Sequence, residues 1–341
     1  MEISRRSLGR LALGAGAAAT GLVGVNAYTE ESAKAATLRL KYRHHGFVFT
    51  SGTSTNILTA RNRAGHDMIK VVTAWGLPWT ANNNQYINFV RDNFTHVIVR
   101  TATGDQGPLD ANTAANELAP WYWAFAAAGK AGNLIFEIGN EPNIRPTSTP
   151  PYFRIVTGAT EIQQWSASFK ATAGKLRDAF PLARRTGGAL APWTSGYTSW
   201  LGNADYKAAV QLCHFFGIHF FGDWVPSLGR VSWDNGWINY MIGTLRGYTT
   251  YNGMKWLATE FGLNSNAMRG YDKGWHYADM MHHDAGPPAT TNKWGCNLWG
   301  GVYYHMDQGN TNGYGNVFPD NGDTNYYNYV VRPHTTDGCG N

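Results

Sequence analysis

The sequence predicts a single α/β domain folded as a (β/α)8 TIM barrel, on three observations. Short apolar, β-branched runs alternate along the chain with longer stretches that have helical periodicity. This alternation predicts parallel strands joined by right-handed crossovers, and about eight such units fit into the chain. No linker, change of composition or internal repeat divides the 341 residues, of which only 15% are charged. A barrel accommodates these units at this length better than an open sheet.

The expected elements follow one another in regular order. The helix over Thr160–Phe180 is the clearest, because Ile162, Trp165, Phe169 and Leu176 fall on one face. The other helices are expected at Asn83–Phe94, Glu117–Ala131, Asp205–Leu212, Trp237–Tyr248 and Asp272–His283. Strands are expected at Leu38–Phe49, Val71–Trp75, His96–Arg100, the start of Leu134–Asn143, Arg185–Pro192, Phe215–Phe221, Lys255–Gly262 and Cys296–Tyr304.

The first 35 residues have the features of a targeting segment. Arg5 and Arg6 precede a run of Gly, Ala and Leu through Val25, which resembles a twin-arginine signal peptide. The run is too weakly apolar for a membrane span, although an N-terminal anchor helix is the alternative. We therefore assign residues 1–35 to an export signal, cleaved near Ala35 or near Ala27, and residues 36–341 to the folded domain. The mature protein is expected to be secreted, monomeric and without stable membrane association.

Charge and cysteine content exclude other classes of protein. The net charge of +5 is spread along the chain without the Lys/Arg cluster of a nucleic-acid groove, so no nucleic-acid partner is expected. The three cysteines are too few and too widely spaced for a disulfide framework, although one pair remains open. Two of them begin strand-like segments and are expected to be buried free thiols; the three are Cys213, Cys296 and Cys339.

Histidine pairs are the only hint of a metal. His44-His45 and His282-His283 have no carboxylate at a useful spacing in the sequence, and no Cys/His pattern has the spacing of a zinc site. We therefore expect neither metal nor cofactor.

Two glutamates each end an apolar run. Glu141 lies in Leu134–Asn143, which reads LIFEIGNEPN, and Glu260 lies in Lys255–Gly262. In a barrel both would reach the carboxyl ends of the strands, where the chemistry of this fold is located. Two carboxyl groups roughly 5–5.5 Å apart are what a retaining glycosidase requires, one as acid and base and the other as nucleophile. Burial and mutual repulsion would separate the two pKa values and assign the roles.

Asn140-Glu141-Pro142 and Thr259-Glu260-Phe261-Gly262 resemble the corresponding motifs of the clan A glycoside hydrolases. This (β/α)8 superfamily includes many cellulases, mannanases and β-glycosidases. The resemblance implies that Glu141, on the fourth strand, is the acid/base and that Glu260, on the seventh, is the nucleophile. It also implies that Asn140 hydrogen-bonds the 2-hydroxyl of the sugar. The motifs do not identify a family within the clan.

Further residues extend the resemblance. His219 matches the start of a His-x-Tyr element, but Phe221 replaces the tyrosine, whose hydroxyl Tyr304 could supply. Arg100 resembles the arginine that orients the nucleophile, although it falls on strand three where many relatives have it on strand two. A structural ion pair between Arg100 and Glu137 is the alternative, with Glu137 facing the barrel interior as a structural partner.

Tryptophans are the candidate sugar platforms, because aromatic planes stack on the apolar faces of sugar rings. Trp299 on strand eight matches the tryptophan that forms the floor of the sugar subsite, with plain packing as the alternative. Trp75 follows a predicted strand and is a substrate-binding candidate, as are Trp79, Trp193 and Trp224. The Gly/Asn-rich loop Met306–Asp323 is expected at the mouth of the barrel, as a binding rim or a mobile connection.

Together these features predict a secreted retaining glycoside hydrolase that cuts a neutral β-glucan, mannan or xylan internally. The same residues would serve an exo-glycosidase or a transglycosylase. A non-catalytic carbohydrate-binding barrel and a metal-dependent hydrolase that uses the histidines are the rivals from other classes.

Overall fold

Eight parallel strands form a closed barrel in the computed structural model. The structure describes residues 44–49, 57–58, 61–62, 65–73, 83–101, 107–147, 153–191, 194–225, 230–232, 236–263 and 297–303. Closure comes from β10 (Lys255–Leu263), which pairs with β11 (Leu298–Tyr303) on one side and β8 (Phe215–Val225) on the other. The ring is completed by β1 (His44–Phe49), β2 (Met68–Val72), β3 (His96–Arg100), β4 (Leu134–Ile138) and β7 (Arg184–Gly187). The predicted (β/α)8 barrel is therefore confirmed.

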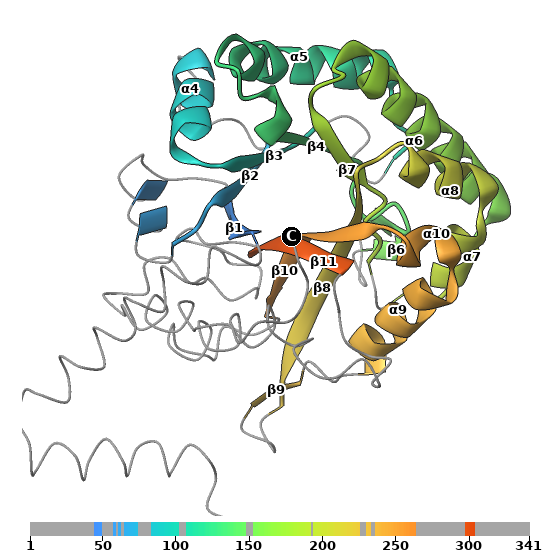
Figure 1. Cartoon of the computed structure of the whole chain (residues 1–341). Helices are drawn as coiled ribbons and strands as arrows, with labels where there is room; N and C mark the ends of the chain where they lie inside the picture. The colour runs from blue at the N-terminus through green and yellow to red at the C-terminus, as the bar shows by residue number, and fades with distance from the viewer. Residues whose placement is uncertain are drawn as a thin grey trace, which may run out of the picture.

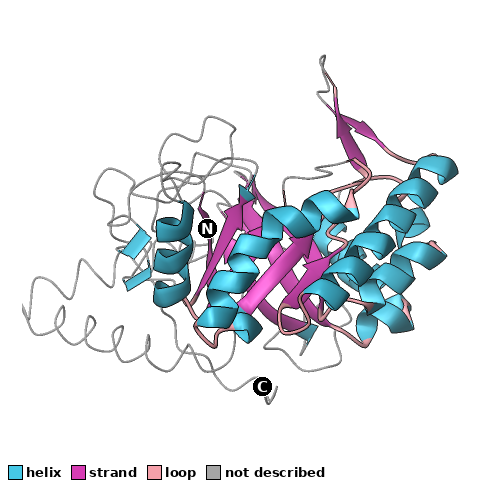
Figure 2. Cartoon of the chain, turned by 90° about the horizontal axis from the view of Figure 1, so that it is seen from above, coloured by secondary structure: helices cyan, strands magenta, loops and turns pink. Residues whose placement is uncertain are grey.

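Helices lie outside the strands, along an arc in Figure 1 that runs from α4 through α5 and α6 to α9. Seen from above, in Figure 2, they cover the outer face of the strand layer. The helix α5 begins earlier than the sequence predicts, because the side chain of Asp110 accepts a hydrogen bond from Thr113 N and caps it. The helices are α4 (Asn83–Asn93), α5 (Ala111–Ala127), η2 (Ala131–Asn133), α6 (Ala159–Ala179), α7 (Tyr197–Gly202), α8 (Ala204–Gln211), α9 (Gly236–Gly247) and α10 (Thr249–Asn252).

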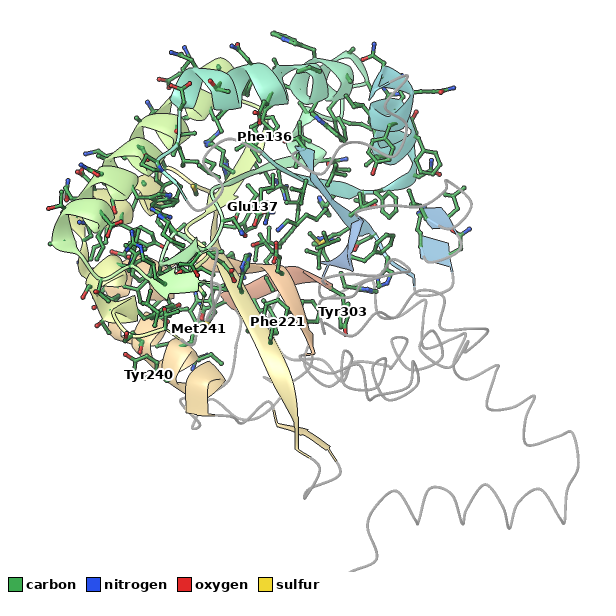
Figure 3. The ribbon with its side chains drawn as sticks, turned by 180° about the vertical axis from the view of Figure 1, so that it is seen from behind. Phe136, Glu137, Phe221, Tyr240, Met241 and Tyr303 are labelled. Carbon is green, nitrogen blue, oxygen red and sulfur yellow. The ribbon has the colours of Figure 1, made fainter. Side chains whose placement is uncertain are left out.

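Alternation along each strand divides the core in two. In β4, Phe136 points toward the helices and the next residue, Glu137, points toward the centre of the ring of strands (Figure 3). The outer core lies between strands and helices and contains most of the buried apolar residues, including the predicted face of α6. The inner core is a smaller apolar layer within the barrel, formed by Val48, Met68, Val72, Ile98, Ile135, Phe215, Leu257 and Val302.

Two antiparallel additions were not expected from the sequence. A short ribbon of β5 (Ile144–Pro146) and β6 (Phe153–Ile155) follows β4. The strand β8 continues to Val225, past the predicted end, and its last residues pair with β9 (Arg230–Ser232). Figure 1 shows this extension projecting beyond the other strands.

Several expectations lie outside the described residues: the export signal, the helix at Asp272–His283, the loop Met306–Asp323, Trp75, Trp79, Trp193, Tyr304, Cys296 and Cys339. The same holds for the side chain of Trp224. Cys213 is buried and free, as predicted, and burial raises the pKa of its thiol to about 12. Within the described part of the chain, none of the helices has the length and hydropathy needed to cross a bilayer.

Candidate active site

Glu141 lies in a turn that follows β4 and has an unusual backbone. Its φ of 40° lies in the left-handed region that residues with a Cβ rarely adopt. The turn is held by a hydrogen bond from Glu141 N to Ala189 O, 3.0 Å long. Such strain persists where the surroundings enforce it, and it concentrates at functional sites.

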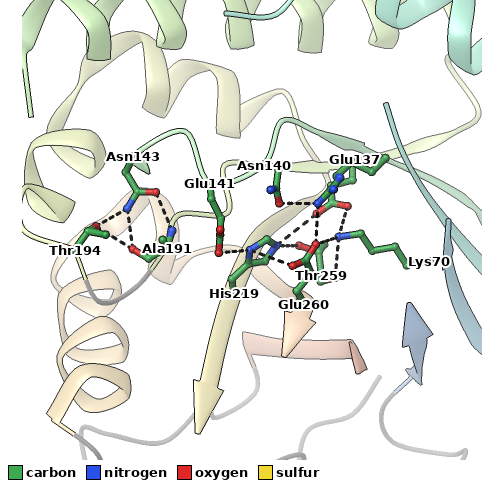
Figure 4. A network of polar contacts seen from close by, with 11 residues as sticks. Lys70, Glu137, Asn140, Glu141, Asn143, Ala191, Thr194, His219, Thr259 and Glu260 are labelled. Carbon is green, nitrogen blue, oxygen red and sulfur yellow. Dashed lines mark hydrogen bonds and ion pairs between the residues drawn. The ribbon is translucent and has the colours of Figure 1, made fainter. Parts of the chain in front are cut away.

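The side chain of Asn143 fixes the same turn to the segment after β7. Its Nδ2 donates to Ala191 O at 2.7 Å and to Thr194 Oγ1 at 2.5 Å. Its Oδ1 accepts from Ala191 N at 2.8 Å, and Asn143 is fully buried. The three bonds join two βα loops through one amide group, and they sit beside Glu141 in Figure 4.

Glu260 enters the site from β10. The register of β10 against β8 shifts between Ala258 and Glu260, which adds one residue, Thr259, to β10. Such a bulge redirects the side chains that follow it. Thr259 and Glu260 consequently both contact the polar network inside the barrel.

His219, on β8, lies between the two glutamates (Figure 4). Its Nδ1 is 3.0 Å from Glu141 Oε1 and 4.0 Å from Glu260 Oε2. Those two oxygens are therefore at most about 7 Å apart. This limit includes the roughly 5–5.5 Å of retaining glycosidases and excludes most of the roughly 6.5–9.5 Å range of inverting ones.

Two cations hold the carboxylate of Glu260. Lys70 Nζ and Arg100 Nη1 each donate to Glu260 Oε1 at 2.8 Å, and Arg100 Nη1 also donates to Asn140 Oδ1 at 2.7 Å. Burial alone would raise the pKa of Glu260, but Lys70, His219 and Arg100 overcome it and lower this pKa to about 2. Glu260 is therefore ionised at neutral pH, as a nucleophile must be.

A second buried carboxylate balances these charges. Glu137 is fully buried, and its Oε2 lies 2.7 Å from Lys70 Nζ as an ion pair. Burial opposes ionisation of Glu137, but Lys70 and His219 lower its pKa below the ordinary value. For His219 the shift is upward. Burial alone would lower its pKa, but the carboxylates of Glu260, Glu137 and Glu141 outweigh this effect and raise the pKa to about 9. His219 is consequently an imidazolium at neutral pH, and its Nε2 donates to Thr259 Oγ1 at 3.0 Å.

The structure brings together five of the predicted site residues: Arg100, Asn140, Glu141, His219 and Glu260. It also adds two residues whose contacts the sequence did not reveal, although Thr259 belongs to the motif quoted for Glu260. Thr259 contacts His219 and Lys70, and Lys70 links Glu137 to Glu260. The only signal for Lys70 was a lysine inside the apolar run Met68–Val72. A charged residue with no exposure within a strand requires a buried partner.

Trp299 does not lie at the mouth, and this expectation was wrong. Its ring centroid is 4.3 Å from that of His44 and 4.5 Å from that of Phe215, which are the first residues of β1 and β8. Because β11 begins at Leu298, Trp299 is at the amino-terminal end of its strand, on the far side of the inner core from Glu260. It cannot form the floor of a sugar subsite beside Glu260. Trp75, the other proposed platform, lies outside the described residues.

The view that His44 has no carboxylate partner also needs correction. Asp67, 23 residues further along, accepts a hydrogen bond from His44 Nδ1, and its other oxygen accepts from His45 N at 2.9 Å. The parallel pairing of β1 with β2 brings them together, which spacing in the sequence could not reveal.

The fold is shared with known glycosidases. No protein-family model and no curated protein matches the sequence. A glycoside hydrolase family 30 subfamily 8 xylanase from Clostridium acetobutylicum is 16% identical, with a TM-score of 0.53 over 85% of this chain and 70% of that one. An endo-1,4-β-mannanase from Rhizomucor miehei is 12% identical, with a TM-score of 0.51 over 85% and 94%. A GH5-4 broad-specificity endoglucanase from Clostridium longisporum is 16% identical, with a TM-score of 0.51 over 82% and 86%. At these identities the likeness shows the fold alone.

Proposed function

We propose that this protein is a retaining glycoside hydrolase with Glu260 as nucleophile and Glu141 as acid/base. The observation that carries the proposal is that both carboxylates contact one atom, His219 Nδ1, while only Glu260 is also held by Lys70 and Arg100. The environments of the two glutamates therefore differ: two cations favour the ionised form of Glu260, which suits a nucleophile, and neither of them bonds to Glu141. A pure carbohydrate-binding barrel would have no use for such an asymmetric pair.

The reaction would proceed by double displacement. A carboxylate oxygen of Glu260 attacks the anomeric carbon while Glu141 protonates the leaving glycosidic oxygen, which gives a glycosyl-enzyme ester and releases the first product. Glu141, now ionised, deprotonates a water molecule that attacks the same carbon and displaces Glu260. Asn140, whose Oδ1 accepts a hydrogen bond from Arg100 Nη1, would bind the 2-hydroxyl of the sugar, as the resemblance implies.

The substrate we propose is a β-linked neutral glycan, such as glucan, mannan or xylan, cut internally after secretion. Support comes from the barrel fold shared with a xylanase, a mannanase and an endoglucanase, and from the twin-arginine-like N-terminus. An exo-glycosidase or a transglycosylase would use the same residues. Product sizes from a defined oligosaccharide separate these activities, because only internal cleavage yields mixed intermediate lengths at early times.

The decisive experiment is Glu260→Gln, assayed against a panel of soluble β-glucan, mannan and xylan. Glutamine keeps the shape of the side chain but removes the nucleophile, so turnover should fall at least about 10³-fold while glycan binding persists. The matched control is Glu161→Gln on α6, which changes an exposed glutamate paired with Arg154 and should retain full activity. Near wild-type hydrolysis by Glu260→Gln would rule out the scheme.

A further inference from the structure

Three potential metal ligands meet at the amino-terminal end of the barrel, away from the candidate active site. His44 is the first residue of β1, Asp67 immediately precedes β2, and His96 is the first residue of β3. One donor atom from each residue lies within 4.8 Å of the other two. Because β1, β2 and β3 are neighbours in the sheet, their backbone pairing fixes the spacing of the three side chains.

His96 supplies an independent sign that this cluster lacks a partner. The residue is 6% exposed, and its Nδ1 is buried without a hydrogen-bond partner among the described residues. A buried polar atom left unpaired is costly, and native structures usually pair it with protein, with ordered water or with an ion. The rings of His44 and His96 lie at a centroid distance of 4.1 Å, and Trp299 covers both at 4.3 and 5.0 Å.

We propose that His44, Asp67 and His96 bind a divalent transition-metal ion of the Zn²⁺ type. Two imidazoles and one carboxylate form a donor set that suits zinc, whereas Mg²⁺ and Ca²⁺ prefer oxygen ligands throughout. The carboxylate of Asp67 offsets part of the charge of the ion. Arg184 opposes binding, because it brings a second positive charge near the ion: its guanidinium carbon lies 5.7 Å from the ring centroid of Trp299, and that ring packs against His44 and His96.

The ion would have a structural role. The cluster joins the starts of three consecutive strands, and the inner apolar core separates it from Glu260. A ligand that binds the folded state and not the unfolded chain stabilises the fold in proportion to its concentration. This proposal is independent of the glycosidase chemistry, so Glu260→Gln should bind the ion like wild type.

The test is titration of untagged, metal-free mature protein with Zn²⁺ by calorimetry, with Co²⁺ absorption as a report on coordination and Mg²⁺ as a negative probe. We expect one equivalent of zinc per chain and a rise in Tm of about 5 °C at hundredfold excess over Kd. His96→Ala should weaken binding at least about 100-fold and abolish the cobalt spectrum. His214→Ala, which removes an exposed imidazole near the start of β8, should bind like wild type.

A second variant keeps the result decisive if His96→Ala does not fold. Asp67→Asn retains an oxygen for the bond to His45 N but removes the charged ligand, so it should weaken zinc binding about tenfold or more. Absence of stoichiometric zinc binding by wild type would overturn the proposal. Wild-type affinity in Asp67→Asn or in folded His96→Ala would overturn it equally.

Discussion

The two ends of this barrel differ in the charge of the buried side chains that the same strand supplies to them. In β3, Arg100 at the carboxyl end is a fixed cation bound to Glu260, whereas His96 at the amino end has its pKa lowered to about 3 by burial, His44 and Arg184. One end therefore concentrates ionised groups, and the other holds a neutral imidazole. Between them Ile98 belongs to the inner apolar core. The inner apolar core thus separates two polar clusters that are only four residues apart in β3, so we expect that each can be altered without the other.

The largest expected effect comes from Lys70→Met, which removes the cation shared by Glu137 and Glu260. Because both carboxylates are buried, the loss leaves Glu137 without its lysine and Glu260 with Arg100 as the remaining one of its two cations, and the free energy of unfolding should fall by roughly 3–5 kcal/mol in urea denaturation. The control is the surface variant Lys170→Met, which breaks an ion pair with Asp205 of the same 2.8 Å length as the Lys70–Glu260 pair. It should lower the free energy of unfolding by less than about 1 kcal/mol.

A double variant separates lost charge balance from lost packing. Adding Glu137→Leu to Lys70→Met removes the buried carboxylate that has lost its lysine. Part of the lost free energy of unfolding should therefore be recovered. Equal stability of the single and double variants would show that the carboxyl end does not depend on this charge balance.

The next effect is a dependence on pH that originates at the carboxyl end. The pKa of His219 is raised from 6.5 to about 9, so the folded state binds more protons than the unfolded chain between these values. The stabilising contribution of His219 is therefore complete below pH 6.5 and is lost as the pH rises through about 9. The total loss should be roughly 3 kcal/mol, measured as unfolding free energies across this window.

His219→Asn should flatten that slope, because asparagine does not titrate. His214→Asn serves as the control, since His214 accepts a hydrogen bond from Arg185 N and contacts none of the three carboxylates. A slope that survives in His219→Asn would assign the pH dependence to groups elsewhere in the protein.

The smallest effect concerns the backbone strain at Glu141. Glycine adopts the φ of 40° without steric cost, whereas alanine keeps the Cβ that opposes it. Glu141→Gly should therefore be more stable than Glu141→Ala by about 1 kcal/mol in thermal denaturation, while both lose turnover. An alanine variant as stable as the glycine variant would mean that the turn stores no strain.

The sequence was sufficient for the barrel and for the order of its strands. Apolar runs that end in Glu141 and Glu260 predicted these residues on strands four and seven of the barrel; Glu260 lies on the seventh strand, and Glu141 lies in the turn that follows the fourth. Alternation of strands with helices defines that order locally, and the carboxyl ends of parallel strands must then share one face.

The sequence could not predict contacts that depend on the exact ends of strands or on the register between strands far apart in the chain. The expected strand Val71–Trp75 left out Lys70, which lies inside β2. The expected strand Cys296–Tyr304 begins before β11, which starts at Leu298. Trp299 was therefore expected too far along its strand, toward the carboxyl end of the barrel. His44 and Asp67 meet only because β1 pairs with β2, and no periodicity within either segment records that register.

The amide of Asn143 has a practical consequence for engineering. Its bonds to Ala191 and Thr194 make the connection after β7 part of the scaffold that sets the Glu141 turn. Loop-exchange libraries aimed at new sugar preferences should therefore retain both anchor positions and diversify the residues around them. A grafted loop without these partners would leave a buried amide unsatisfied and would release the turn that holds Glu141.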